Sequence, residues 1–351
     1  MKHTSTDYTV MSRRGVLAAG LAAVAGASAL AGCGGHAEAG SAPAGSAPSH
    51  ASATEVRVAS LKGPTSIGLV SFMDRAKDAD AFENGYTFTV ATSADEILPS
   101  MIKGDLDISL IPANAASVLY NKTEGGVRCL DINTLGVLSV VTGDASLTDF
   151  EQLANRTVYL TGKGTTPEYA MNYLLAAAGI ADTVTLEFKS EAAEVVSVLA
   201  ADASAVGILP QPFVTAALVK NPALSAPIDL TDVWSAYSED GSRMVTGATV
   251  VRAAFADEHP EAVEEFLKAQ NASVDAVNDD PSAAAPLVVE AGIVDAEPIA
   301  AKAIPGCHLV CITGDDMAAA LSGYLQVLSD ADPSSVGGAL PGEDFYLDLD
   351  A

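Results

Sequence analysis

The chain has 351 residues, of which 18 are Lys or Arg and 45 are Asp or Glu, so its formal charge is −27. Such an excess of acid, without a basic tract, excludes nucleic acids and anionic membrane surfaces as electrostatically driven partners. A chain with 49% apolar and 18% charged residues is expected to fold, and its length suits about two domains.

The first 32 residues have the layout of an export signal. Lys2, Arg13 and Arg14 precede an uncharged, Ala- and Gly-rich run over 15–32. The run ends at Leu-Ala-Gly-Cys33, which resembles the lipobox of bacterial lipoproteins, where the Cys thiol receives the lipid and becomes the first mature residue. We therefore expect residues 1–32 to be a signal peptide and Cys33 to be lipidated; the alternative is an uncleaved signal anchor.

Residues 12–17 resemble a twin-arginine export motif but have Val16 where that motif carries an aromatic residue, so twin-arginine and Sec export both stay open. The next segment, 33–54, is almost entirely Gly, Ala, Ser and Pro, a composition typical of a flexible tether. A lipid followed by a tether predicts a protein anchored at the outer face of the bacterial cytoplasmic membrane.

The remaining cysteines are Cys129, Cys307 and Cys311, which allow at most one disulfide. Cys307 and Cys311 flank His308, as in some zinc sites, but the group lies in an apolar stretch and has no second Cys/His pair. We expect structural thiols, no metal and no cofactor.

From Val56 onward, apolar runs alternate with helical periodicity, which favours an α/β fold. Two Lys-Gly-x-Thr turns, 62–65 and 163–166, each follow an apolar run and precede a helix-like segment. Further along, 108–122 and 206–220 match each other as a strand, a Pro turn and a helix. This repetition predicts two similar lobes facing each other across a cleft.

Local signals define several helices. Pro167 suits a first helical position and Gly179 a C-terminal stop, which predicts a helix over 167–178. We expect one helix to run from Thr65 through Met73, and the hydroxyls of Thr65 and Thr166 to cap their helices. The apolar spacing of 259–277 and 315–328 predicts two late helices that pack on the first lobe.

Taken together, these features resemble the substrate-binding proteins of ABC importers, in the group that binds sulfonates, nitrate and thiamine precursors. The resemblance covers about residues 55–350 and rests on the order of its motifs: the lipobox, 58–65, 104–108, 146–158, 162–168 and 249–252. It implies a bilobal α/β fold of the type II periplasmic-binding class, in which the chain crosses between lobes twice, near 134–141 and 244–251. The first lobe would be 55–140 plus 246–351, and the second 141–245.

The resemblance also implies that ligand contacts lie at the strand ends facing the cleft. Carried over by position, they are Gly63, Pro64, Thr65, Ser66, Ala113, Asn114 and Thr134 from the first lobe and crossing, and Gly164, Thr165, Thr166, Glu168, Gln211 and Pro212 from the second. Helix starts and hydroxyls suit a small carboxylate or sulfonate, although neither Gly/Thr turn has an Arg to grip an acid group. Trp234, the single tryptophan, walls the cleft or packs in the second lobe.

The function that follows is capture of a small solute by a monomer that delivers it to a membrane permease and its ATPase. An enzyme on the same fold, of the pyrimidine-synthase or menaquinone-pathway type, is the alternative, and so is a ligand-sensing lipoprotein. Catalysis would need a placed base or nucleophile, and none of the five His falls in the predicted cleft. We therefore expect no enzyme and no catalytic residues.

Overall fold

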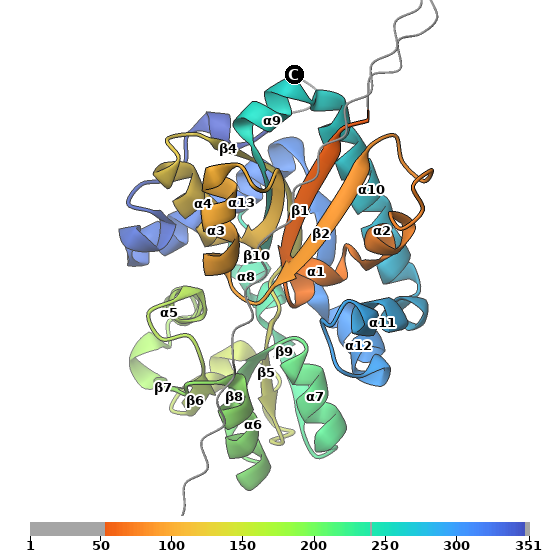
Figure 1. Cartoon of the computed structure of the whole chain (residues 1–351). Coiled ribbons are helices and arrows are strands. Elements are labelled where there is room, and N and C mark those ends of the chain that lie inside the picture. Colours follow the sequence, from red (N-terminus) through yellow and green to blue (C-terminus); the bar gives the residue numbers. More distant parts are fainter. Residues whose placement is uncertain (1–52, 239–240, 348–351) are drawn as a thin grey trace, which may run out of the picture. The chain divides into compact units, whose positions relative to one another are not determined.

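A computed structural model describes residues 53–238 and 241–347. The predicted signal peptide, the lipidated Cys33 and nearly all of the tether lie outside these residues. Within them the strands form two sheets, drawn one above the other in Figure 1. The first sheet has the order β11 (Leu309–Ile312), β4 (Val127–Leu135), β10 (Val245–Arg252), β3 (Ile108–Pro112), β1 (Glu55–Leu61) and β2 (Gly85–Ala91). The second has the order β7 (Thr185–Phe188), β6 (Thr157–Leu160), β8 (Val206–Pro210), β5 (Leu138–Thr142) and β9 (Ser225–Asp229).

The two sheets repeat one strand arrangement. In the first, β2, β1 and β3 are parallel and β10 is antiparallel to β3. In the second, β7, β6 and β8 are parallel and β5 is antiparallel to β8. The order β2-β1-β3-β10 thus corresponds to β7-β6-β8-β5, with the antiparallel strand of each sheet next to a crossing of the chain. This is the structural form of the internal repeat seen in the sequence.

Helices connect and cover the strands of both sheets. The helices that precede β9 in the sequence are α1 (Pro64–Ile67), α2 (Val70–Arg75), α3 (Ala94–Lys103), α4 (Ala113–Lys122), α5 (Thr166–Ala177), α6 (Ala192–Ala201) and α7 (Phe213–Lys220). After it come α8 (Leu230–Tyr237), α9 (Ala253–Glu258), α10 (Pro260–Asp279), α11 (Pro281–Glu290), α12 (Glu297–Ala303) and α13 (Gly314–Ala331). No helix among the described residues is both long and apolar enough to cross a membrane.

The helix predictions are right in position and wrong in two details. The segment predicted as one helix from Thr65 to Met73 is two, α1 and α2, because the chain turns at Gly68, where a side chain would meet Val274 of α10 at 3.2 Å. Neither threonine caps its helix. The Thr65 hydroxyl donates to Leu61 O, and Thr166 is already inside α5.

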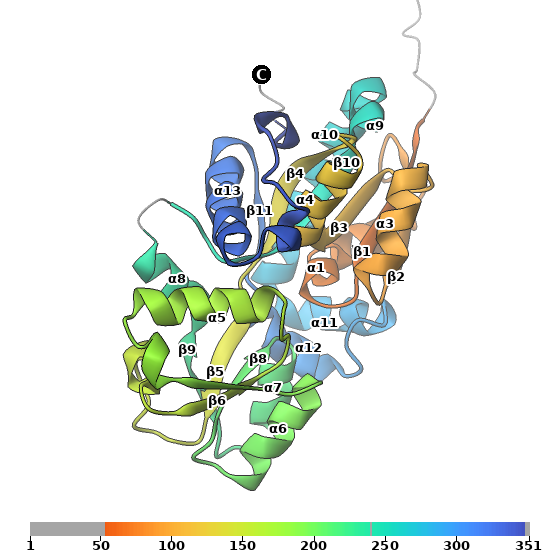
Figure 2. The same cartoon turned by 90° about the vertical axis from the view of Figure 1, so that its left-hand side faces the viewer.

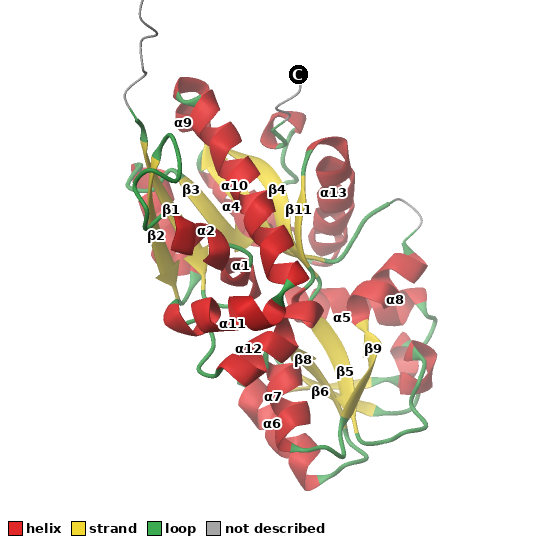
Figure 3. Ribbon diagram, turned by 90° about the vertical axis from the view of Figure 1, so that its right-hand side faces the viewer, coloured by secondary structure: helices red, strands yellow, loops and turns green. Residues whose placement is uncertain are grey.

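The C-terminal helices pack as expected, with one addition. α10 lies along the first sheet next to α2 and α11 (Figure 3). α13 packs on α4, β4 and β10, and also contacts α5 of the second sheet (Figures 1 and 2). A single buried apolar cluster accordingly contains Ile132 of β4 and Val140 of β5, so the core is continuous from one sheet to the other along this side.

Asp107 anchors the start of β3 through a buried ionic cluster. Its carboxylate, with 2% of the side chain exposed, accepts hydrogen bonds from Arg57 Nε and Nη2 at 2.8 and 2.7 Å and from Arg252 Nη2 at 2.7 Å. Burial acts to raise the pKa of Asp107, but the hydrogen bonds from the two guanidinium groups outweigh it and hold the pKa below its usual value.

We predict that Asp107→Ala lowers the free energy of unfolding by about 2 kcal/mol at pH 7, because two partly buried guanidinium groups lose their partner. Since the folded-state pKa is depressed, this stabilisation is fully present above the unfolded pKa of about 4 and is lost progressively as pH falls from there through the folded-state pKa. Urea unfolding at pH 7 and pH 3 measures both effects. Asp257→Ala, which breaks an exposed pair with Arg128, is the control and should cost less than about 1 kcal/mol; an equal loss in the two variants would contradict this account.

Candidate functional site

The predicted residues of the first sheet meet at the end of its strands. Thr134, next to the last residue of β4, lies opposite Gly247 of β10, and Gly247 also pairs with Pro112 at the end of β3. A side chain on Gly247 would lie 2.5 Å from Thr65 Cγ2 and would overlap Asn133 Oδ1. Thr65, Asn133 and Thr134 therefore form one buried group, which we call the floor group, around a glycine that leaves them room.

The hydroxyl groups in this region already donate their protons to neighbouring oxygen atoms. Thr65 Oγ1 donates to Leu61 O at 2.9 Å, and Ser66 Oγ donates to the same carbonyl while contacting Ser60 Oγ. Thr134 Oγ1 donates to Asn133 Oδ1 at 2.9 Å. Because each hydroxyl has one proton, these oxygens are left mainly as acceptors. Gly63, the N-cap of α1, has a φ of +132°, a conformation that favours glycine.

The predicted residues of the second sheet gather in the first turn of α5. The Glu168 carboxylate accepts from Gly164 N at 2.5 Å, and Thr165 Oγ1 donates to Gly162 O at 2.6 Å. Glu168 thus places its own negative charge at the helix start, where an anionic ligand was expected to bind. The other expected anion site, at α1, is the start of a helix of four residues.

Helix α5 is also tied to the far end of α13. Tyr169 Oη lies 3.0 Å from Asp332 Oδ2 and 3.1 Å from Gly164 O, so its one proton is shared between two acceptors. Asn114 Nδ2, at the turn after β3, donates to Ser335 O at 3.2 Å in the same segment. Residues 332–335 therefore link the predicted turn of the first sheet to α5, although neither Tyr169 nor Asp332 was predicted.

Gln211 reaches across to the first-sheet side of the molecule. It follows β8, its Oε1 accepts from Thr215 Oγ1 at 2.9 Å, and its Nε2 lies 2.6 Å from where a side chain on Gly306 would begin. Gly306 belongs to a short 3₁₀ helix, Ile304–Cys307, that leads into β11. The Gln211–Pro212 peptide bond is cis.

His308, predicted to lie in an apolar stretch outside the cleft, contacts the first crossing between the sheets. The crossing from β4 to β5 consists of Gly136 and Val137. Gly136 O lies 2.6 Å from His308 Nδ1 and accepts from Thr231 Oγ1 at 3.0 Å, and His308 Nε2 is 3.6 Å from Asp229 Oδ2. His308 itself is held at a φ of +47°. An imidazole next to β11 thus joins the crossing to α8 and β9.

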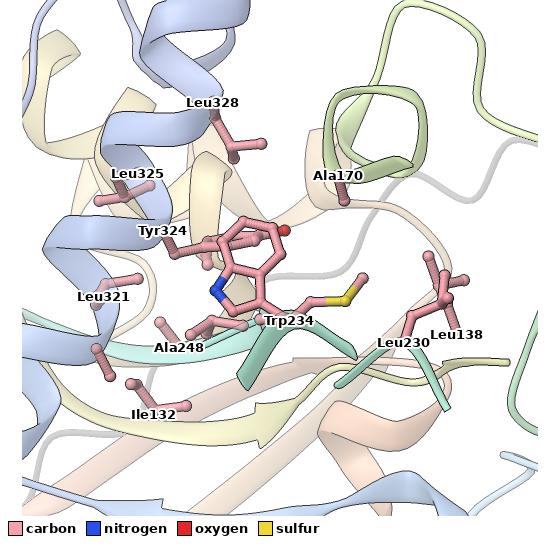
Figure 4. Close-up of a cluster of buried hydrophobic side chains, with 14 of the residues drawn as sticks. Ile132, Leu138, Ala170, Leu230, Trp234, Ala248, Leu321, Tyr324, Leu325 and Leu328 are labelled. Atoms are coloured by element: carbon pink, nitrogen blue, oxygen red, sulfur yellow. The ribbon is translucent and has the colours of Figure 1, made fainter. Parts of the chain in front are cut away.

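Trp234 is fully buried and packs between the two sheets. Its ring centroid is 4.4 Å from that of Tyr173 in α5 and 5.3 Å from that of Tyr324 in α13. Figure 4 shows it among Ile132, Leu230 and the apolar side chains of α13. Of the two roles left open for Trp234, packing is the one found, and it extends beyond the second sheet.

The thiols are buried or half-buried and unpaired. Cys129 and Cys307 have no exposed surface, and Cys311 is partly covered. Burial raises the pKa of the Cys307 thiol to about 12, as expected for an inert structural cysteine. Among the described residues, no group of three or more His, Cys, Asp or Glu is arranged to hold a metal ion.

The predicted ligand residues do not line the described cavities. One of about 480 Å³ lies between the start of α13 and the C-terminal segment, and others lie beside α2 and beside α8. The predicted residues instead lie in separate places: in and around the floor group, at the start of α5, and at Gln211. Residues 332–335 contact Asn114 and α5, and residues 304–308 lie beside Gln211 and the first crossing.

No family model and no curated protein sequence matches the chain. Solved structures do. A crystal structure of an ABC transporter from Parabacteroides distasonis has a TM-score of 0.71 at 24% identity, covering 84% of this chain and 99% of that one. The periplasmic aliphatic sulphonate-binding protein of Escherichia coli has a TM-score of 0.65 at 11% identity, covering 84% and 92%. A ligand-binding component of an ABC-type import system from Staphylococcus aureus has a TM-score of 0.59 at 12% identity, covering 84% and 96%.

The chain has the bilobal periplasmic-binding fold. This confirms the fold class predicted from the sequence, with two α/β lobes built on the two sheets. From here we call the body of the first sheet the first lobe and that of the second sheet the second lobe.

We predict that Gly247→Ala disrupts the floor group, because its Cβ would overlap both Thr65 and Asn133. Urea unfolding should show a loss of about 1–3 kcal/mol, the usual cost of overpacking a rigid site. Thr246→Ala, the neighbouring change on the same strand, removes atoms without adding a clash and is the control. Equal stability of Gly247→Ala and the wild type would mean that the floor group is not rigid.

Proposed function

We propose that the protein is the solute-binding component of an ABC importer. The observation that carries the proposal is the match of 84% of the chain to 99% of an ABC transporter structure, together with the repeated strand–turn–helix units that carry the predicted ligand residues. The three solved structures described above are named as transport or import proteins, which favours binding over catalysis.

The proposed binding site lies between the lobes, with residues 55–140 and 246–351 as one lobe and 141–245 as the other. The contacts we propose are the predicted residues Gly63, Pro64, Thr65, Ser66, Asn114, Thr134, Gly164, Thr165, Thr166, Glu168, Gln211 and Pro212. Lipidation of Cys33 would hold the protein at the membrane surface, where a permease with its ATPase would receive the solute.

The ligand we propose is a small organic solute held mainly by hydrogen bonds. A carboxylate or sulfonate was expected from the helix starts, and the neighbour from Escherichia coli binds aliphatic sulphonates. Against this, the Glu168 carboxylate faces the start of α5 and repels an anion placed there. Amides and hydroxyls of the floor group serve neutral solutes equally well.

We predict that a thermal-shift panel of sulfonates, carboxylates, amines and neutral solutes on residues 55–351 reveals at least one ligand. A solute present at 100 times its Kd adds about 2.7 kcal/mol, which raises Tm by several degrees. Native mass spectrometry of the purified protein checks the same point by showing what co-purifies. Absence of any shift over the whole panel would contradict solute binding, and a shift with anions alone would restore the anion preference.

We predict that Tyr169→Phe weakens the ligand so found by about fivefold, because it removes a hydrogen bond of roughly 1 kcal/mol that joins the lobes when they are closed. Calorimetric titration measures the change. Tyr237→Phe is the matched control, since its hydroxyl donates to Glu151 Oε1 at 2.6 Å within the second lobe. If both variants changed affinity alike, the Tyr169–Asp332 contact would have no role in closure.

A further inference from the structure

A carboxyl group is buried in the first lobe without a cation. Asp131 of β4 has no exposed surface, and its Oδ1 accepts from Thr249 Oγ1 at 3.1 Å and from Gln270 Nε2 at 2.9 Å. Both partners are neutral. Among the described residues no Lys, Arg or His pairs with it, in contrast to Asp107, which has two guanidinium partners. An ionised carboxylate in such a place would carry a large desolvation penalty.

Two buried acceptor atoms, one on each of two side chains in contact, have no partner. Asp131 Oδ2 and Gln270 Oε1 are both buried and make no hydrogen bond. They belong to the same pair of side chains that already meet through Gln270 Nε2 and Asp131 Oδ1. A carboxylic acid and a carboxamide that meet side by side form two hydrogen bonds if the acid keeps its proton. One proton on Asp131 Oδ2, donated to Gln270 Oε1, would therefore satisfy both atoms.

A bound cation, a water molecule or a flipped amide accounts less well for the two unpartnered oxygen atoms. A metal cation would sit next to the amide protons of Gln270 and needs several more oxygen ligands. A water molecule could donate to both oxygens but would leave the carboxylate charge uncompensated. Turning the amide over does not remove the need for a proton, because Gln270 Oε1 would then face Asp131 Oδ1 at 2.9 Å.

The surroundings also disfavour a charge. Burial raises the pKa of Asp131 to about 7, against the opposing effect of the hydrogen bonds from Thr249 and Gln270. The titratable groups that act on this carboxyl are Cys129 on the same strand and Cys311 on β11, and Asp275 of α10 acts on Cys311. None of these three groups is a cation.

A chain of hydrogen bonds connects this pair to the floor group. Thr249 Oγ1, which donates to Asp131, accepts from Asn133 Nδ2 at 3.1 Å, and Asn133 Oδ1 accepts from Thr134 Oγ1 at 2.9 Å. In this chain of hydrogen bonds, the role of each side chain as donor or acceptor fixes the role of its neighbour. The orientation of the Asn133 amide, and with it the Thr134 hydroxyl, therefore depends on Asp131.

We propose that Asp131 is a protonated positioning residue, whose Oδ2–H donates to Gln270 Oε1 and whose Oδ1, through Thr249, holds Asn133 and Thr134 in the orientation that the solute meets. The first half of the proposal stands on the buried pair alone. The second half rests on the proposed function.

The proton is tested by ¹³C NMR of the wild-type protein labelled at Asp side chains, with Asp131→Asn used to assign the signal. We expect the Asp131 carboxyl to stay protonated at pH 5, where an ordinary aspartate of pKa about 4 is mostly ionised. An ionised Asp131 carboxyl at pH 5 would overturn the proposal.

Stability gives a second readout. Because the folded-state pKa is raised, the wild type should lose stability relative to Asp131→Asn as pH rises from about 4 to about 7, and the difference should be constant above that. The asparagine amide can donate to Gln270 Oε1 at every pH. A difference in Tm between the two proteins that did not change over this range would contradict a raised pKa, and one that changed with sodium concentration would indicate a bound cation instead.

Positioning is tested by calorimetric titration with a solute from the panel at pH 6. Asp131→Asn should keep Kd within about twofold, whereas Asp131→Leu, which cannot accept from Thr249, should weaken it by about tenfold. Wild-type affinity in Asp131→Leu would overturn the positioning role. The two halves of the proposal can be distinguished. If the Asp131 carboxyl of the wild type is protonated at pH 5 but no solute binds the wild type, the result contradicts the proposed function and supports the protonated Asp131–Gln270 pair.

Discussion

The buried contact of Trp234 with Tyr173 and Tyr324 joins the two lobes, and the rest of the fold is arranged around it. Its indole has no exposed surface, and Nε1 donates to Ser242 Oγ at 3.2 Å, so the one polar atom of the ring is satisfied inside the core. Burying an aromatic side chain of this kind contributes about 2–3 kcal/mol. Opening the lobes at this side would expose that surface, which disfavours their separation along α13.

Polar contacts also join the two lobes. His308 and Thr231 meet the carbonyl of Gly136 at the crossing, and Tyr169 meets Asp332 near the start of α5. Hydrogen bonds of this kind exchange with water at a net cost of about 1 kcal/mol each. Each of these contacts therefore contributes little to the free energy that holds the lobes together.

Sequence reasoning reached those parts of the molecule that local patterns determine. The repeat of strand, glycine turn and helix predicted the two lobes, and Pro167 with Gly179 predicted α5. It could not reach contacts between distant residues, such as Tyr169 with Asp332, or the use of Glu168 at its own helix start. Two signals in the sequence were not used: Gly247 inside an apolar run, which indicates close approach by a neighbour, and Asp131, a lone acid flanked by Leu130 and Ile132.

The acidity of the chain bears on how its interior can be built. The chain has 18 basic residues against 45 acidic ones, so cationic partners are scarce, and Arg57 and Arg252 both pair with Asp107. The negative potential of the whole chain raises the cost of any further buried carboxylate, which makes a neutral acid at Asp131 the less costly state. The floor group above it is accordingly neutral, made of one amide and two hydroxyls. Hydrogen bonds, and not charge, therefore fix the orientation of its side chains.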